Sequence, residues 1–207
     1  MAALMGAGVF LTARDVLGAS DFWNRKDPAA WTSEQILQLA TRSPWATQAR
    51  VVPKPGRDRG STQTLAPDVA GGRSGGRGTG PDPVVQVTEV TVVWSSAKPL
   101  LDVLKTSFPM DFTCHYVISI MELPPGPHGK AMTQDAMEAS LQVKGNGSIG
   151  AGAIQLTRQA AIFGFSKDLL PISATDKEVL FELTTDQYTI RARFTPKEML
   201  YRGALAV

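Results

Sequence analysis

The chain has 207 residues, of which 43% are hydrophobic and 7% aromatic, and this composition is ordinary for a soluble globular protein of one or two domains. Its single cysteine, Cys114, excludes an intramolecular disulfide and a cysteine-rich zinc site, although it does not decide the cellular compartment. The formal net charge of +2 comes from the middle of the chain. Residues 50–83 carry six basic and three acidic groups, whereas residues 84–207 are almost neutral.

Residues 1–20 have the pattern of a secretory leader. Met1 to Ala13 is a run of small and aliphatic residues that is too short to span a bilayer, and Leu17 to Ser20 offer a small-residue cleavage site. No basic residue precedes the run, and the alternative is a helix docked on the domain or a frayed terminus. We expect export to the periplasm, the envelope or the medium, with no transmembrane helix in the mature chain.

Residues 21–49 are predicted to form a short helical segment. Thr32 and Gln35 make a capping box, so the helix is expected to begin there, run to about Thr41 and end before Pro44. This element is amphipathic and short, and it therefore needs another surface to pack against.

Three tryptophans surround this helix and give it more aromatic surface than it can bury alone. Two alternatives follow. The segment packs on the downstream domain of its own chain, or it docks to a partner, in which case the candidate docking residues are Trp23, Trp31 and Trp45.

Residues 50–83 are predicted to be a flexible linker. They hold eight glycines and five prolines with few large apolar side chains, which cannot offset the entropy lost on ordering. The GGRSGGRG run is similar to the arginine–glycine segments that bind RNA. It has only two such arginines and no aromatic residue, so the composition favours a linker over a nucleic-acid binder.

Residues 84–207 are predicted to be an α+β domain with a mainly antiparallel sheet of about six strands and two or three short helices. Apart from the final hairpin, the strands are expected at 84–94, 113–121 and 160–165. The helices are expected after a serine cap at Ser95 or Ser96, with Pro99 in the first turn, and from Thr133 to the glycine at 145.

The best-specified stretch is an antiparallel hairpin made of residues 178–184 and 188–194. In each strand the apolar side chains alternate with polar ones, which is the pattern of half-buried strands. Glutamates on the first strand, Glu178 and Glu182, are expected to pair with Arg191 and Arg193 on the second. After it, a capping box at Thr195 predicts one helical turn, and a last strand follows to the end of the chain.

Two stretches carry a resemblance to a known group of proteins. They are FWNRKDPAAWTSEQILQLATRSPWA, which follows the apolar leader, and VLFEL…YTIRARFTPKEMLYRGALAV near the end. Both resemble uncharacterised exported proteins from soil bacteria of the acidobacterial type. The resemblance implies export and a β-rich C-terminal domain, and it assigns no site residues.

Gly145 to Gly150 spell GxGxxG, the glycine pattern of a dinucleotide-binding turn. The expected helix before this run and the antiparallel β pattern after it do not make a βαβ unit. A loop that ends a helix, with glycines at positive φ, is the favoured interpretation.

Cys114 and His115 suggest a thiol–imidazole pair, but neighbours on a strand point to opposite faces, and a buried inert cysteine is favoured. The other histidine, His128, lies in a proline-rich loop, and two histidines alone do not make a zinc site. The carboxylates of Asp102, Asp111 and Glu122 are scattered.

No constellation of these residues supplies a nucleophile, a base and an orienting group together. The sequence therefore favours an exported, non-catalytic binding or interaction module without a cofactor, whose partner is unknown and for which an envelope protein is a candidate. Two alternatives stay open: a hydrolase or nucleotide-binding enzyme with an unrecognised site, and weak nucleic-acid association through residues 50–83.

Overall fold

The computed structural model describes residues 21–54, 89–105, 108–109, 112–124, 132–157 and 160–207. The helices there are α2 (Phe22–Arg25), α3 (Ser33–Thr41) and α4 (Lys98–Leu104), with 3₁₀ turns at Pro28–Ala30, Gln134–Ala136 and Pro196–Glu198. The strands are β1 (Ala46–Pro53), β2 (Glu89–Trp94), β3 (His115–Met121), β4 (Met137–Val143), β5 (Gly147–Gly150), β6 (Ala153–Leu156), β7 (Ala160–Ser166), β8 (Val179–Thr185), β9 (Tyr188–Phe194), β10 (Leu200–Tyr201) and β11 (Ala204–Leu205).

One curled antiparallel sheet dominates the described part of the chain. Its nine strands follow the order β5-β4-β8-β9-β1-β2-β3-β7-β6, and every pairing is antiparallel. The two edge strands, β5 and β6, are joined by Ala151 and Gly152. The Ala151 amide donates to the Ala139 carbonyl of β4, and the Gly152 amide donates to the Gly164 carbonyl of β7, both at 2.9 Å. The two ends of the sheet are therefore joined by a bent, hydrogen-bonded connection, as the curl of the sheet requires.

Aromatic side chains fill the inside of this curl. Phe181 on β8 lies against Phe163 and Phe165 on β7, with ring centroids 5.6 and 6.0 Å apart. Trp94 on β2 meets Phe194 on β9 edge to face at 5.2 Å. All five side chains are almost completely buried. The two halves of the sheet thus share one core.

β1 joins the two halves of the sheet. Ala46 to Arg50 pair with β2, and Val51 to Pro53 pair with β9. The predicted boundary at residue 50 therefore falls inside a strand, and the segment 21–49 continues directly into the sheet. Arg50 is paired with Glu89, so residues 55–88, where most of the predicted linker lies, connect two neighbouring strands of a single sheet. Those residues, like the predicted leader at 1–20, lie outside the described part of the chain.

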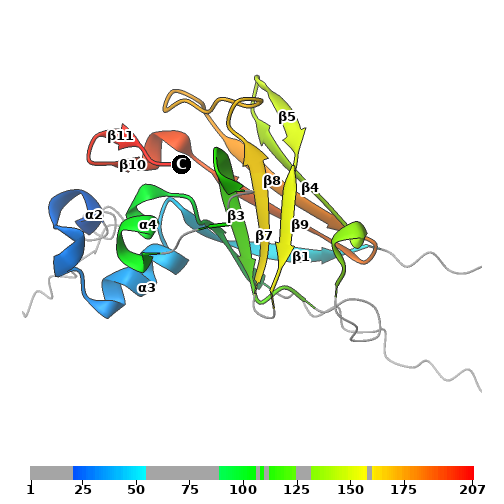
Figure 1. Ribbon diagram of the computed structural model, residues 1–207, viewed down its shortest axis with the longest axis horizontal. Helices are drawn as coiled ribbons and strands as arrows, with labels where there is room; N and C mark the ends of the chain where they lie inside the picture. The colour runs from blue at the N-terminus through cyan, green and yellow to red at the C-terminus, as the bar shows by residue number, and fades with distance from the viewer. Residues whose placement is uncertain (1–20, 55–88, 106–107, 110–111, 125–131, 158–159) are drawn as a thin grey trace, which may run out of the picture.

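Helices and the small β10–β11 hairpin gather at one end of the sheet (Figure 1). α3 has the predicted capping box, with the Gln35 amide donating to Thr32 Oγ1 and the Thr32 amide donating to Gln35 Oε1. Asn24 at the end of α2 bonds the Leu200 carbonyl and the Arg202 amide, which ties the start of the described chain to its final hairpin.

The hairpin β8–β9 confirms the two predicted strands and the facing of their side chains. Val179, Phe181 and Leu183 are buried, and the predicted cross-strand pairs form between Arg191 and Glu182 and between Arg193 and Glu178.

The helix predicted from Thr133 is wrong. Only Gln134–Ala136 form a 3₁₀ turn, and Met137–Val143 form β4, whose side chains alternate between buried and exposed. Most residues of β4 have a weak preference for helices, of a few tenths of a kcal/mol each; they are Met, Glu, Ala, Leu and Gln. That preference is smaller than the gain from pairing β4 with β8 over its whole length. The sequence prediction also missed β5 and β6, which are only four residues long.

The end of the chain also differs from the prediction. Thr195 makes no side-chain cap, and the expected helical turn is the 3₁₀ turn Pro196–Glu198. The expected last strand is the two-stranded β10–β11, which reverses at Arg202 and Gly203. Both residues have positive φ, 52° and 82°, as a type I′ turn requires. Likewise α4 begins after Ala97 rather than after a capping serine, although Pro99 does lie in its first turn.

Candidate functional site

An apolar groove lies where α3 and α4 meet the outer face of the sheet. The sheet contributes Thr91 and Val93 from β2, Ser119 and Met121 from β3, and Ala160 and Ile162 from β7. The register places these residues on one face, because Thr91 is paired with Met121 and Ser119 with Ile162. The helices contribute Leu37, Ala40 and Thr41 from α3 and Leu100, Leu101 and Leu104 from α4. The cavity has a volume of about 540 Å³.

Exposed hydrophobic side chains concentrate at this groove. Five large hydrophobic residues are exposed in the described part of the chain, and three of them line it: Leu37, Leu104 and Met121, which are 63%, 52% and 42% exposed. Single exposed apolar residues are normal on a protein surface, but several around one cavity indicate a binding site. The groove is therefore the leading candidate site.

The groove contains hydroxyl groups but no basic side chain among its described residues. Ser95 Oγ, at its floor, donates to Ser119 Oγ at 2.7 Å. Thr91 Oγ1 bonds the side chain of Gln48 on the neighbouring strand β1. The one ionisable residue is Glu122, which follows β3 and has a positive φ of 57°. The lining of the groove is thus suited to an uncharged, apolar group.

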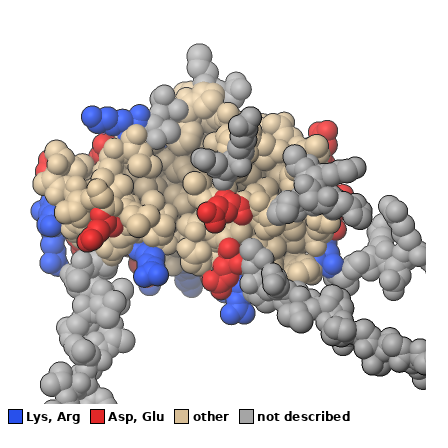
Figure 2. All heavy atoms as spheres, turned by 90° about the horizontal axis from the view of Figure 1, so that it is seen from below, with Lys and Arg blue, Asp and Glu red and all other residues tan. Residues whose placement is uncertain are grey.

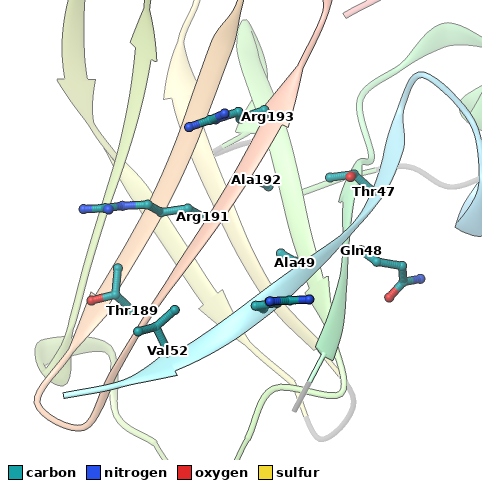
Figure 3. Close-up of a pocket in the computed structure, with 9 residues that line it drawn as sticks. Thr47, Gln48, Ala49, Val52, Thr189, Arg191, Ala192 and Arg193 are labelled. Atoms are coloured by element: carbon teal, nitrogen blue, oxygen red, sulfur yellow. The ribbon is translucent and has the colours of Figure 1, made fainter. Parts of the chain in front are cut away.

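A second cavity, the arginine wedge, opens where β1 and β9 separate (Figure 3). The two strands pair only as far as Val51 and Ile190. The wedge has a volume of about 510 Å³ and includes the last paired positions as well as the separated ones. It is lined by Thr47, Gln48, Ala49, Arg50, Val52, Thr189, Arg191, Ala192 and Arg193. It is polar and cationic, whereas the groove is apolar.

Each arginine of the wedge has one glutamate nearby, either on a neighbouring strand or, for Arg193, just before β8 begins. Arg191 Nε donates to Glu182 Oε2 at 2.5 Å, and this hydrogen bond, with the negative charge of Glu182, raises the pKa of the guanidinium. Arg50 Nε lies 3.9 Å from Glu89 on β2, and Arg193 Nε lies 3.9 Å from Glu178. The three arginine side chains are 66–77% exposed, so these ion pairs contribute little to stability.

The wedge and the groove lie on the same outer face of the sheet. Gln48, which lines the wedge, is paired with Thr91, which lines the groove. Gln48 Nε2 donates to Thr91 Oγ1 at 2.9 Å, so the two cavities meet at this pair. Figure 2 shows one face of the molecule, on which acidic and basic residues are interspersed in a mostly uncharged surface.

The three tryptophans proposed as docking residues are buried inside the chain. Trp23 packs edge to face on Trp45, and Trp31 packs on Phe22 and lies near Tyr201. Trp45 Nε1 donates to the Ala206 carbonyl at 2.7 Å. Of the two alternatives, the structure shows these side chains packed within their own chain. Their surfaces are therefore not available to a partner.

The expectation that Cys114 is buried is wrong. Cys114 is exposed and has a φ of 63°, because the chain turns there before β3 begins at His115. His115 Nδ1 lies 2.8 Å from the Thr113 carbonyl. The other histidine, His128, and the carboxylate Asp111 lie outside the described residues, and Asp102 pairs with Lys98 at 2.8 Å.

The GxGxxG run is the turn of the β4–β5 hairpin. Gly145 and Gly147 have the expected positive φ, 90° and 109°, but they follow a strand rather than a helix. The Asn146 amide donates to the Val143 carbonyl at 2.9 Å, which closes the turn. A strand follows where a dinucleotide site needs a helix N-terminus.

The chain matches no protein-family model, no curated protein and no solved structure. In the part of the chain that the structure describes, no helix is long and apolar enough to cross a membrane. Across those same residues no group of three or more histidine, cysteine, aspartate or glutamate side chains is placed to hold a metal ion. Function is therefore inferred from the geometry of the groove and the wedge.

Sequence reasoning did not find the groove. Leu37, Leu104 and Met121 lie in elements whose other apolar residues enter the core, so their side chains look like ordinary members of amphipathic segments. Arg191 and Arg193 were predicted only as cross-strand partners of Glu178 and Glu182. Arg50 was not joined to them, because its strand was assigned to the linker.

Proposed function

We propose that this protein is an exported, non-catalytic binding protein that holds an uncharged, apolar part of its ligand in the apolar groove. The observation that supports the proposal is the concentration of Leu37, Leu104 and Met121 around one cavity. Its volume of about 540 Å³ lies in the range of roughly 300–1,000 Å³ that is typical of small-molecule sites. Export rests on the leader pattern of residues 1–20 and on the resemblance to exported proteins.

A catalytic role for the groove has less support. Ser95 and Ser119 hydrogen-bond each other, and neither hydroxyl bonds an imidazole or a carboxylate of the described residues. A serine nucleophile needs such a base to remove its proton. The hydroxyl pair instead satisfies two polar groups at the floor of an apolar site.

Binding of a neutral fluorescent dye tests the groove. 1-N-phenylnaphthylamine is uncharged and becomes bright in an apolar site, so its fluorescence should rise on addition of the protein and saturate. Leu37→Lys and Met121→Lys should each weaken its binding by about tenfold, because they place a charge where apolar surface is buried on binding. Both side chains are exposed, so these variants should keep the thermal stability of the wild type.

The matched control is Leu169→Lys, which changes the most exposed large hydrophobic residue of the described chain at a site outside the groove. Its dye affinity should equal that of the wild type. Absence of saturable dye binding, or equal weakening by all three lysine variants, would contradict the proposal. Export has a separate test, which is the intact mass of the protein recovered from the envelope and cytoplasmic fractions of its host.

A further inference from the structure

We infer that the apolar groove binds a molecule with a neutral carbonyl group, a ketone, aldehyde or ester on an apolar chain, and that Ser119 Oγ donates a hydrogen bond to the carbonyl oxygen. This inference rests on the proposed function, because it names the ligand class of the same groove. Three features of the described residues carry it: the central position of Ser119, a hydroxyl proton without an acceptor, and a lining without a basic side chain.

The first feature is the position of Ser119 in the floor of the groove. Ser119 lies on β3, where it is paired with Val93 of β2 on one side and with Ile162 of β7 on the other. Both neighbours line the groove, as does Met121 two residues further along β3, so these side chains share one face of the sheet. Ser119 is only 6% exposed. A ligand in the groove therefore covers its hydroxyl group.

The second feature is a hydroxyl proton for which the described residues offer no acceptor. Ser95 Oγ lies 2.7 Å from Ser119 Oγ and 3.5 Å from the Val93 carbonyl, so its proton is directed at Ser119. A serine hydroxyl group donates one hydrogen bond and accepts up to two. Ser119 Oγ accepts the one from Ser95, but its own proton reaches no acceptor among the described residues. The serine pair thus presents one spare donor to the groove.

The other hydroxyl groups of the lining already use their protons. Thr41 Oγ1 donates to the Leu37 carbonyl of its own helix at 2.8 Å. Thr91 Oγ1 donates to Gln48 Oε1 at 3.3 Å and accepts from Gln48 Nε2. Of the four hydroxyl groups that line the described part of the groove, that of Ser119 alone therefore keeps a proton without an acceptor.

This spare donor decides between ligands of similar shape. An alkyl chain that covers Ser119 leaves the donor buried without a partner, which costs free energy. A carbonyl oxygen at the same place accepts the hydrogen bond, and the carbonyl group brings no donor of its own into an apolar site. Sites that are built to make a hydrogen bond reject analogues without the matching group for this reason. The same hydrogen bond fixes the orientation of the ligand in the groove.

The third feature selects a neutral acceptor over a carboxylate. The described lining of the groove has no basic side chain, and its one ionisable residue is Glu122. An ionised carboxylate in the groove loses hydration without gaining an opposite charge, and the negative charge of Glu122 repels it. A carbonyl group is polar but uncharged, so one hydrogen bond from Ser119 offsets most of its smaller desolvation cost.

Competition against the bound dye tests this inference on the full chain. Nonan-2-one and 2-methylnon-1-ene have nearly the same shape, because a methylene group replaces the carbonyl oxygen, and only the ketone has a hydrogen-bond acceptor. Each is titrated against 1-N-phenylnaphthylamine held in the groove. The readout is the ratio of the affinities for the ketone and for the alkene, compared between variants, because the cost of removing each ligand from water then cancels.

Ser119→Ala removes the donor and should lower this ratio by about fivefold, which is the strength of a hydrogen bond between uncharged groups. Ser119→Cys keeps a side chain of similar shape but is a weaker donor, so it should also lower the ratio. The matched control is Thr41→Val, which removes a hydroxyl group of the same groove whose proton is already used. It should keep the wild-type ratio. All three variants should bind the dye as the wild type does, because the dye has no carbonyl group.

Three results would overturn the inference: an unchanged ratio in both Ser119 variants, an equal fall in Thr41→Val, or a ketone that does not displace the dye. Ionised nonanoate gives the last comparison. It should displace the dye less well than the ketone, and stronger displacement by nonanoate would refute the choice of a neutral group. Each of these results leaves the proposed function standing if the dye still binds, whereas absence of dye binding contradicts the proposed function itself.

Discussion

The chain 84–207, which the sequence delimits as a domain, should not fold without residues 21–54. Deleting residues 21–54 removes β1, the shared partner of β2 and β9. The same deletion removes Trp23, Trp31 and Trp45 from the core. A buried tryptophan covers roughly 150–250 Å² of surface, so the three correspond to about 11–19 kcal/mol of gross hydrophobic stabilisation at ~25 cal/mol per Å². A domain of this size has a net stability of only about 5–15 kcal/mol.

The assay is near-ultraviolet circular dichroism and thermal unfolding of the truncated chain beside the full one. We expect the truncated chain to lack a cooperative transition. Its control is a chain in which residues 55–88 are replaced by about eight glycine and serine residues, which keeps every described strand. This variant should unfold cooperatively, with a free energy of unfolding about 1 kcal/mol higher because its loop is shorter. A truncated chain that melts like the full protein would refute the single-core reasoning.

Two further predictions concern stability. Burial raises the pKa of Tyr188 to about 12 and also raises the pKa values of Tyr116 and Tyr201, so the folded protein favours the neutral phenols. The contribution of these tyrosines to the free energy of unfolding should therefore be constant below about pH 10 and be lost between about pH 10 and 12. Urea unfolding at several pH values should show a less steep loss over this range in Tyr188→Phe, and an equal loss in both proteins would contradict this cause. Gly164→Ala should lower the free energy of unfolding by about 1–3 kcal/mol, because the added Cβ would lie 2.8 Å from Phe112 Cδ1. An unchanged urea midpoint would show that Phe112 moves aside at no cost.

Local sequence patterns predicted the elements that are determined by contacts between residues close in sequence. The β8–β9 hairpin follows from alternation that matches the strand period, and its two glutamate–arginine pairs follow from that register. The capping box of α3 depends on residues three apart in sequence, so it was also visible in advance. β4 was not, because its residues favour a helix weakly and its pairing with β8 and β5 makes it a strand.

The candidate site depended on contacts between residues far apart in sequence. The groove combines three strands with two helices, and none of its exposed side chains differs in kind from those that enter the core. The wedge joins Arg50 to Arg191 across a strand pairing that no local pattern indicates.

By itself the sequence determined the hairpin, the helix cap, the antiparallel class of the sheet and the need of three tryptophans for a surface to cover them. Only the tertiary structure decided where that surface is and that residues 46–53 form the strand between the two halves of the sheet. The physical reason is that strand pairing is set by long-range complementarity. A strand with polar and basic residues on its outer face, next to a glycine-rich segment, carries no local signal of the partners that complete it.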